Sequence, residues 1–266
     1  MNILYIIIAI LFFGVLIIVH ELGHFSVAKW CNIRVDEFAI GMGPAILSRQ
    51  KGETLYSWRA VPFGGYCAMG EDDGDSDDPR AFVNQSVWKR FLVLVAGSAN
   101  NFILGFLIIL ILVSVWNAGG APFGRIVAHS WNLTTDLCKL VWESLGMLVR
   151  GEAGINDLTG PVGIVNVMTD MATESDGVLD AFSNLAYFGA FVALNLAIMN
   201  MLPIPALDGG RVFFLLVTAL IEKISGKKLN PKYENYVHMA GMVLLLALMA
   251  YIMFHDIINL VFAAKS

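Results

Sequence analysis

One short segment carries the residue types that a zinc enzyme needs, His20-Glu21-Leu22-Gly23-His24. In a helix, residues four apart lie on one face about 6 Å apart, so both imidazoles can bind a single Zn²⁺ ion. Glu21 follows the first histidine, about 100° around the helix. There its carboxylate can accept a proton from a water beside the metal. The pattern predicts a zinc hydrolase site with His20 and His24 as ligands and Glu21 as general base.

A catalytic zinc site has three protein ligands and keeps a fourth position open. Asp208 is the candidate for the third ligand, because it follows a long stretch, residues 181–207, that carries no formal charge. Pro203 and Pro205 lie near the end of this stretch and cannot continue a regular helix. Unwound backbone at membrane depth is tolerated only where it is buried or lines a wet cavity, so a carboxylate beyond the break can turn toward a metal. The alternative is that Asp208 caps the helix that begins near Gly209.

The composition indicates a membrane protein. Of 266 residues, 57% are hydrophobic and 15% are charged, whereas soluble domains carry about 25% charge. A chain of this size has more apolar residues than one water-soluble core can bury. The net charge of −5 gives no support to nucleic-acid binding, which needs a basic patch. Cys31, Cys67 and Cys138 are far apart, which favours neither a disulfide framework nor a cysteine metal site.

Four apolar segments are long enough to cross a bilayer, whose core takes about 20 helical residues. We expect spans at about residues 3–28, 91–116, 181–202 and 237–257, and a further apolar helix at Val212–Ile221. Lys and Arg concentrate between the first two spans and between the last two. The positive-inside rule then places both termini outside, and His20 and Asp208 near the cytoplasmic ends of their spans. The two motifs can therefore meet at one depth.

Three connecting segments complete the predicted fold. Residues 35–69 are rich in strand-forming and turn residues and indicate short β-structure against the membrane. Apolar residues recur at helical spacing over 133–149, which predicts an amphipathic helix on the outer surface. The acidic run Glu71–Asp78 is expected to be a solvated loop. We therefore predict an α-helical polytopic membrane protein: four transmembrane helices, a small membrane-associated β-element and an outer amphipathic helix, in a single domain over 1–266.

These residues resemble the site-2 proteases, in particular their bacterial RseP-like branch of intramembrane metalloproteases. The two signature motifs occur in the right order, as His-Glu-x-x-His at 20–24 and Asn-x-x-Pro-x-Pro-x-Leu-Asp-Gly at 200–209. Four other segments are similar to family segments: FAIGMGP at 38–44, PFGGY at 62–66, AGSANNF at 96–102 and GPVGI at 160–164. The resemblance covers nearly the whole chain.

The resemblance implies zinc bound by His20, His24 and Asp208, with Glu21 as base. It also implies a substrate-holding role for Asn200, and for Asn101 either such a role or a hydrogen bond between helices. The turn of the β-element would pair with an extended substrate by main-chain hydrogen bonds; its residues are Phe63, Gly64, Gly65 and Tyr66. The implied substrates are single-span proteins of a bacterial inner membrane, such as membrane-held anti-sigma factors or leftover signal peptides.

Two departures from the family pattern stand out. A PDZ domain normally follows the second span on the outer side, but here family-like sequence resumes near Gly124, so we expect that domain to be absent near 117–124, naturally or by truncation. Ser98 replaces a proline that usually follows Ala-Gly. The sequence gives no oligomeric state, no cleavage bond and nothing that gates substrate entry.

Two rival functions stay open. A zinc transporter or sensor would also place His and Asp inside a membrane. It would not need Glu21 beside the first ligand, and transporters tend to have broken helices in both halves, whereas only the third span here is interrupted. A catalytically inactive scaffold is disfavoured, because no candidate ligand is missing.

Overall fold

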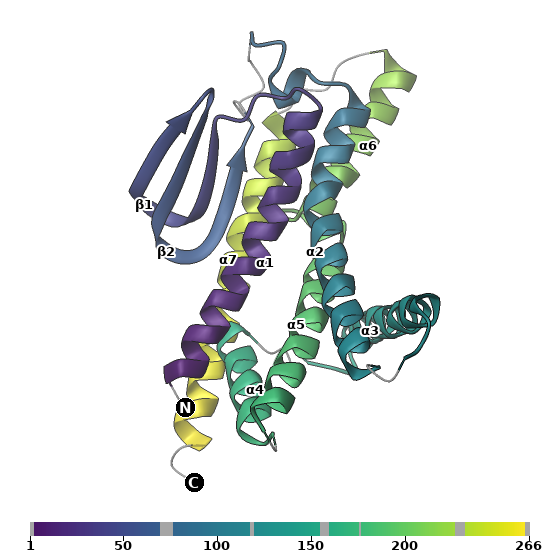
Figure 1. The fold of residues 1–266 in the computed structure, drawn as a ribbon. Helices are drawn as coiled ribbons and strands as arrows, with labels where there is room; N and C mark the ends of the chain where they lie inside the picture. Colours follow the sequence, from purple (N-terminus) through teal and green to yellow (C-terminus); the bar gives the residue numbers. More distant parts are fainter. Residues whose placement is uncertain are drawn as a thin grey trace. The chain divides into compact units, whose positions relative to one another are not determined.

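The computed structural model describes residues 3–69, 77–117, 120–154, 160–175, 177–226 and 232–263. Within these ranges the elements follow the order shown in Figure 1: α1 (Ile3–Trp30), β1 (Glu37–Lys51), β2 (Thr54–Ala68), a 3₁₀ turn η1 (Phe82–Asn84), α2 (Val87–Trp116), α3 (Phe123–Arg150), α4 (Pro161–Thr173), α5 (Val178–Asn200), α6 (Asp208–Ser225) and α7 (Lys232–Ala263). Most of the acidic run Glu71–Asp78 lies outside the described residues.

Four of these helices are long and apolar enough to cross a membrane. The spans are Leu11–Trp30, Val87–Trp116, Val178–Asn200 and Tyr236–Phe254. Each agrees with a predicted span to within a few residues, apart from the start of the first, and the predicted helical class with its small β-element is confirmed. The chain is therefore a multi-pass membrane protein.

The chain divides into two compact units, one of residues 12–101 and 199–242, the other of residues 1–11, 102–198 and 243–266. The core of the first unit joins α1, the segment after it, α2 and α6; its buried members include Ala28, Ile33, Val35, Val93, Leu94, Val212 and Leu215. The core of the second joins α2, α3 and α5 through Ile109, Val113, Leu137, Ala190 and Leu194. Every candidate site residue belongs to the first unit.

The β-element is one antiparallel hairpin of two long, irregular strands rather than several short ones. The beginning of β1, residues 37–40, pairs with 65–68 and also with 55–58, while the end of β1 pairs with the start of β2. β1 therefore bends, and Gly41 permits this with φ 86°. A side chain there would also collide with the Val61 carbonyl. Residues 37–40 therefore lie between residues 55–58 on one side and residues 65–68 on the other.

Three of the described helices lie outside the predicted spans, and α6 among them contains the predicted apolar helix Val212–Ile221. α3 extends the predicted amphipathic segment to Phe123–Arg150 and buries Ser130, Thr134, Leu137 and Val141 along one stripe. α4 is a helix that the periodicity of this region did not indicate. A residue of α7 caps its N-terminal turn, because the Asp256 carboxylate accepts a hydrogen bond from the Gly163 N–H at 3.0 Å.

The predicted break after the third span is present. α5 ends at Asn200 and α6 begins at Asp208, with no helix in residues 201–207. Pro203 and Pro205 explain the interruption, since neither has an N–H for a helical hydrogen bond. Ala206 then adopts φ +81°, a left-handed conformation that is uncommon for a residue with a Cβ. The chain turns here and presents Asp208 at the first turn of α6.

Candidate metal centre

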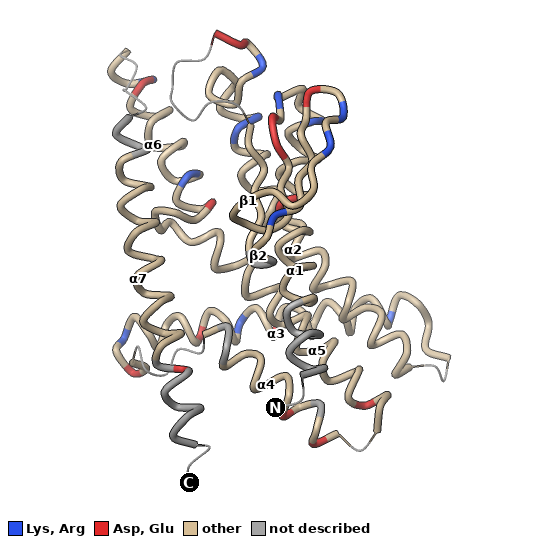
Figure 2. Tube along the Cα trace, turned by 90° about the vertical axis from the view of Figure 1, so that its left-hand side faces the viewer, with Lys and Arg blue, Asp and Glu red and all other residues tan. Residues whose placement is uncertain are grey.

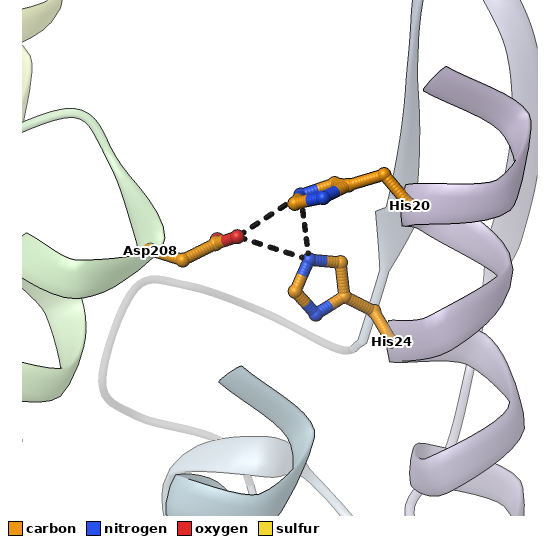
Figure 3. Close-up of side chains that lie close together, drawn as sticks. All are labelled: His20, His24 and Asp208. Atoms are coloured by element: carbon orange, nitrogen blue, oxygen red, sulfur yellow. Dashed lines mark hydrogen bonds and ion pairs between the residues drawn. The ribbon is translucent and has the colours of Figure 1, made fainter. Parts of the chain in front are cut away.

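Three side chains from two helices converge on one point. His20 and His24 project from neighbouring turns of α1, and Asp208 points at them from the start of α6 (Figure 3). Asp208 Oδ2 lies 3.0 Å from His20 Nε2 and 3.3 Å from His24 Nε2, and the two Nε2 atoms are 3.2 Å apart. Ligand atoms bonded to one tetrahedral zinc at about 2.0–2.1 Å lie roughly 3.4 Å from each other. The triangle therefore matches three corners of a zinc coordination shell.

Two of the three side chains are almost fully buried. The side chains of His20 and His24 are 10% and 5% exposed, and that of Asp208 is 20% exposed. These are the only described residues whose His, Cys, Asp or Glu donor atoms form such a cluster. Burying a carboxylate is costly unless a cation or hydrogen-bond donors compensate it.

A backbone carbonyl selects the tautomer of His24. Its Nδ1 lies 2.8 Å from the Val93 carbonyl oxygen, which can only accept. Nδ1 therefore carries a proton, and Nε2, which faces Asp208, is the ring nitrogen available to a metal. This outer hydrogen bond is the arrangement that metal-binding histidines usually show.

Asn101 contacts the outer ring nitrogen of His20, as the Val93 carbonyl does for His24. Its amide nitrogen lies 3.4 Å from His20 Nδ1, the side chain is fully buried, and its Oδ1 has no hydrogen-bond partner. Turning the amide by 180° would resolve both features, because Oδ1 would then accept from a protonated Nδ1 and Nε2 would be free for a metal. The contact favours the expected alternative, a hydrogen bond between helices, over direct contact with substrate.

Glycine in α2 makes room for both rings. A Cβ on Gly97 would lie 2.7 Å from Cε1 of His24 and 2.8 Å from Cε1 of His20. On the facing helix, a Cβ on Gly23 would collide with the Ala96 carbonyl. The two helices therefore pack backbone against backbone at the metal centre, and the imidazoles fill the space that Gly97 leaves. Sequence reasoning did not assign Gly97, although its place in AGSANNF was a usable signal.

Glu21 lies between the metal ligands and the hairpin. Its carboxylate lies close to the Cys67 backbone N–H. A Cβ on Gly65 would be 3.4 Å from Glu21 Cγ. The predicted base and part of the predicted substrate turn are thus neighbours. The side chain of Phe63 lies outside the described residues, and Asn200 is the last residue of α5; substrate contact by any of these residues stays a prediction.

Ion pairs fix the hairpin to the end of α1, and Figure 2 shows charged residues gathered over the two strands. Glu53 at the turn binds Lys29 at 2.6 Å and Arg80 at 2.9 Å. Hydrogen bonds from Arg80 and Lys29 hold the pKa of the Glu53 carboxyl at about 2. Glu37 accepts hydrogen bonds from Ser57, Arg59 and Tyr66. Although partial burial opposes it, these bonds lower the pKa of Glu37.

Cys67 is not among the residues whose donor atoms cluster at the metal centre. Burial, together with the nearby charge of Glu21, raises the pKa of its thiol to about 12. The three cysteines are free. The donor set of two imidazoles and one carboxylate, with a glycine beside the rings, fits zinc, which such ligands bind in catalytic sites.

Comparison with known proteins agrees with this site. The model of Peptidase family M50 matches residues 8–248. A Clostridium acetobutylicum protein named as a zinc metalloprotease is 32% identical over 339 aligned residues, which cover 95% of this chain and 97% of that protein. The regulator of sigma-W protease RasP of Bacillus subtilis is 24% identical, covering 93% of this chain and 97% of its own.

These alignments are longer than the 266 residues of this chain. The relatives therefore contain residues that this chain lacks. That these include a PDZ domain between the second and third spans stays a prediction. The match over nearly the whole chain, together with the His20, His24 and Asp208 cluster, shows that this chain is a zinc metalloprotease of peptidase family M50, the site-2 proteases.

Proposed function

We propose that this chain is an endopeptidase that cleaves single-span membrane proteins within or beside their transmembrane segments, with zinc held by His20, His24 and Asp208. The convergence of the three donor atoms within 3.3 Å carries the proposal. Two of these ligands come from an apolar span and the third follows the break after another. The metal centre therefore lies among apolar helices long enough to cross a membrane, which suits a substrate that is itself a transmembrane segment.

Zinc, when bound there, polarises the peptide carbonyl and lowers the pKa of a water molecule toward about 7. Glu21 takes the proton of that water and later delivers it to the leaving amine. The Cys67 N–H lies close to the Glu21 carboxylate, and Val93 and Asn101 orient the two rings. Because the nucleophile is water, no residue of the chain forms a covalent bond to the substrate.

The extended substrate lies beside residues 63–66 of the hairpin, and Asn200 binds its backbone. Main-chain pairing suits an enzyme that accepts several sequences, since it reads the backbone and not the side chains. Gly65 and Cys67 lie beside Glu21, so a strand added to this segment would pass in front of the base. A substrate helix must unwind first, because a helix has no free backbone groups to pair.

The protein acts in a bacterial inner membrane, with both termini outside and the metal centre toward the cytoplasmic side. The support is the excess of Lys and Arg between the first two and the last two spans. One relative is named a regulator of sigma-W protease. Membrane-held anti-sigma factors are therefore the first substrate class to test, and leftover signal peptides are the second.

The test is cleavage of a tagged single-span protein in detergent, with zinc content measured on the same samples. Wild type, Glu21→Gln and Asp208→Ala are compared with Asp136→Ala, which removes an exposed carboxylate on α3. We expect cleavage by wild type and Asp136→Ala only, with zinc retained in Glu21→Gln and lost in Asp208→Ala. Cleavage by Glu21→Gln at the wild-type rate would refute the assigned base. Zinc uptake into vesicles that survives Glu21→Gln, without any cleavage, would favour a transporter.

A further inference from the structure

The segment that presents Asp208 has few internal hydrogen bonds. In residues 201–207, Pro203 and Pro205 have no N–H, and the Ile204 N–H bonds only two residues back, to the Leu202 carbonyl at 2.7 Å. The next donor along the chain, the Ala206 N–H, bonds to no backbone group but to a side chain of α7. This donor is Ala206 N, and its acceptor is His238 Nδ1 at 3.2 Å.

This hydrogen bond falls on the most unusual backbone conformation near the site. Ala206 has φ +81°, a conformation that is strained for a residue with a side chain and persists only when its surroundings enforce it. Since an N–H can only donate, His238 must accept through Nδ1 and carry its proton on Nε2. His238 therefore holds a strained residue that lies two positions before Asp208.

Packing supports the same assignment. Gly241, almost one turn after His238, lies so close to the segment that a Cβ there would be 2.9 Å from the Pro205 carbonyl carbon. The ring of His238 meets the ring of Phe214 edge to face, with centroids 5.3 Å apart. Phe214 belongs to α6, the helix that Asp208 begins. α7 thus contacts the segment at Pro205 and Ala206, and α6 at Phe214.

We propose that His238 is a positioning residue for the metal ligand Asp208. By accepting the Ala206 N–H it keeps φ of Ala206 positive, and that turn directs Asp208 toward His20 and His24. Without the acceptor, Ala206 can relax to a negative φ, which redirects the chain just before the ligand. The proposal rests on the zinc-ligand role of Asp208 proposed above.

The test replaces His238 by each of two amide residues, Asn and Gln, whose side-chain oxygens fall at the positions of different imidazole nitrogens. Asn at position 238 puts its oxygen where Nδ1 lies, and Gln puts it where Nε2 lies. Full-length His238→Asn, His238→Gln and wild type are purified with zinc, and zinc release to a chelator is followed with a dye. Tyr236→Phe, at an exposed position of the same helix, is the matched control. Circular dichroism and thermal unfolding report folding.

Outer-shell partners of metal ligands typically change metal affinity 10–100-fold. We expect zinc affinity to fall about tenfold or more in His238→Gln, with His238→Asn and Tyr236→Phe close to wild type and all four proteins folded. Equal zinc affinity in the Asn and Gln variants would overturn the proposal, whether both match wild type or both lose zinc. If His238→Gln does not fold, His238→Asn decides alone, and a zinc affinity well below wild type in a folded His238→Asn protein would reject it.

Failure of the proposed function has a different signature. If Asp208→Ala binds zinc as tightly as wild type, Asp208 is not a ligand, and the role of His238 fails with it. If Asp208→Ala loses zinc while His238→Gln retains it, only the positioning role is refuted.

Discussion

The sharpest test of the metal centre is a single methyl group on α2. We predict that Gly97→Ala lowers zinc affinity about 100-fold without unfolding the protein. Its Cβ would lie 2.7 Å from His24 Cε1 and 2.8 Å from His20 Cε1, whereas unstrained carbon atoms approach to about 3.5–4.0 Å. One or both rings must therefore move by about 1 Å.

A shift of that size exceeds what the site tolerates. Metal–ligand distances in working sites stay within about 0.2 Å of their usual values. His24 cannot move freely, because its Nδ1 is bound to the Val93 carbonyl, and α1 and α2 cannot separate easily, because Gly23 lies against Ala96. We therefore expect zinc affinity to fall about 100-fold, and cleavage to fall with it.

The assay is zinc content per protein after dialysis against a weak chelator, together with thermal unfolding. Gly14→Ala on α1 is the matched control, since the same methyl group there meets nothing within 4 Å. It should keep zinc and cleavage unchanged. Full zinc content and wild-type cleavage in Gly97→Ala would refute the geometry of the centre, because the rings could then not occupy the space beside Gly97.

Three other predictions follow from contacts away from the metal. The pKa of Glu53 in the folded protein is about 2 instead of 4.5, so its contribution to stability is present above about pH 4.5 and is lost as pH falls toward 2. The melting temperature should thus drop more between pH 6 and pH 3 in wild type than in Glu53→Gln; equal drops would contradict this. Asp256→Ala should destabilise the protein by about 1–2 kcal/mol in thermal unfolding, because the Gly163 N–H loses its acceptor. Asp256→Asn, which keeps an acceptor, should cost less; equal losses would reject the capping role. Cys67→Ser should leave zinc content unchanged, since Cys67 is not among the residues whose donor atoms cluster at the metal centre; loss of zinc would make it a ligand.

The parts of the fold that sequence predicted are those with local causes. An apolar run of about 20 residues has few alternatives to a membrane helix, and the four spans are present. His20 and His24 are brought together by the helical repeat alone. The break before Asp208 was predictable from the lack of N–H groups in Pro203 and Pro205.

The residues that sequence reasoning missed act over long distances in the chain. His24 bonds to Val93 and His20 contacts Asn101, 69 and 81 residues away. No periodicity reports such pairs, because they depend on the rotation of α2 against α1. Gly97 was visible as part of a family-like segment, but its purpose follows only from the ring atoms that surround it.

α4 and the hairpin show the same limit at larger scale. α4 is short, and Asp256 of α7, 93 residues after Gly163, accepts a hydrogen bond from its first turn. The local sequence pattern around α4 does not predict such a distant partner. The sequence of β1 predicts strand, yet it does not predict that residues 37–40 pair on both sides. That pairing puts residues 65–67 beside Glu21. The ligands of this enzyme are therefore specified locally, whereas the surroundings that orient the ligands and the base are specified by packing between distant segments.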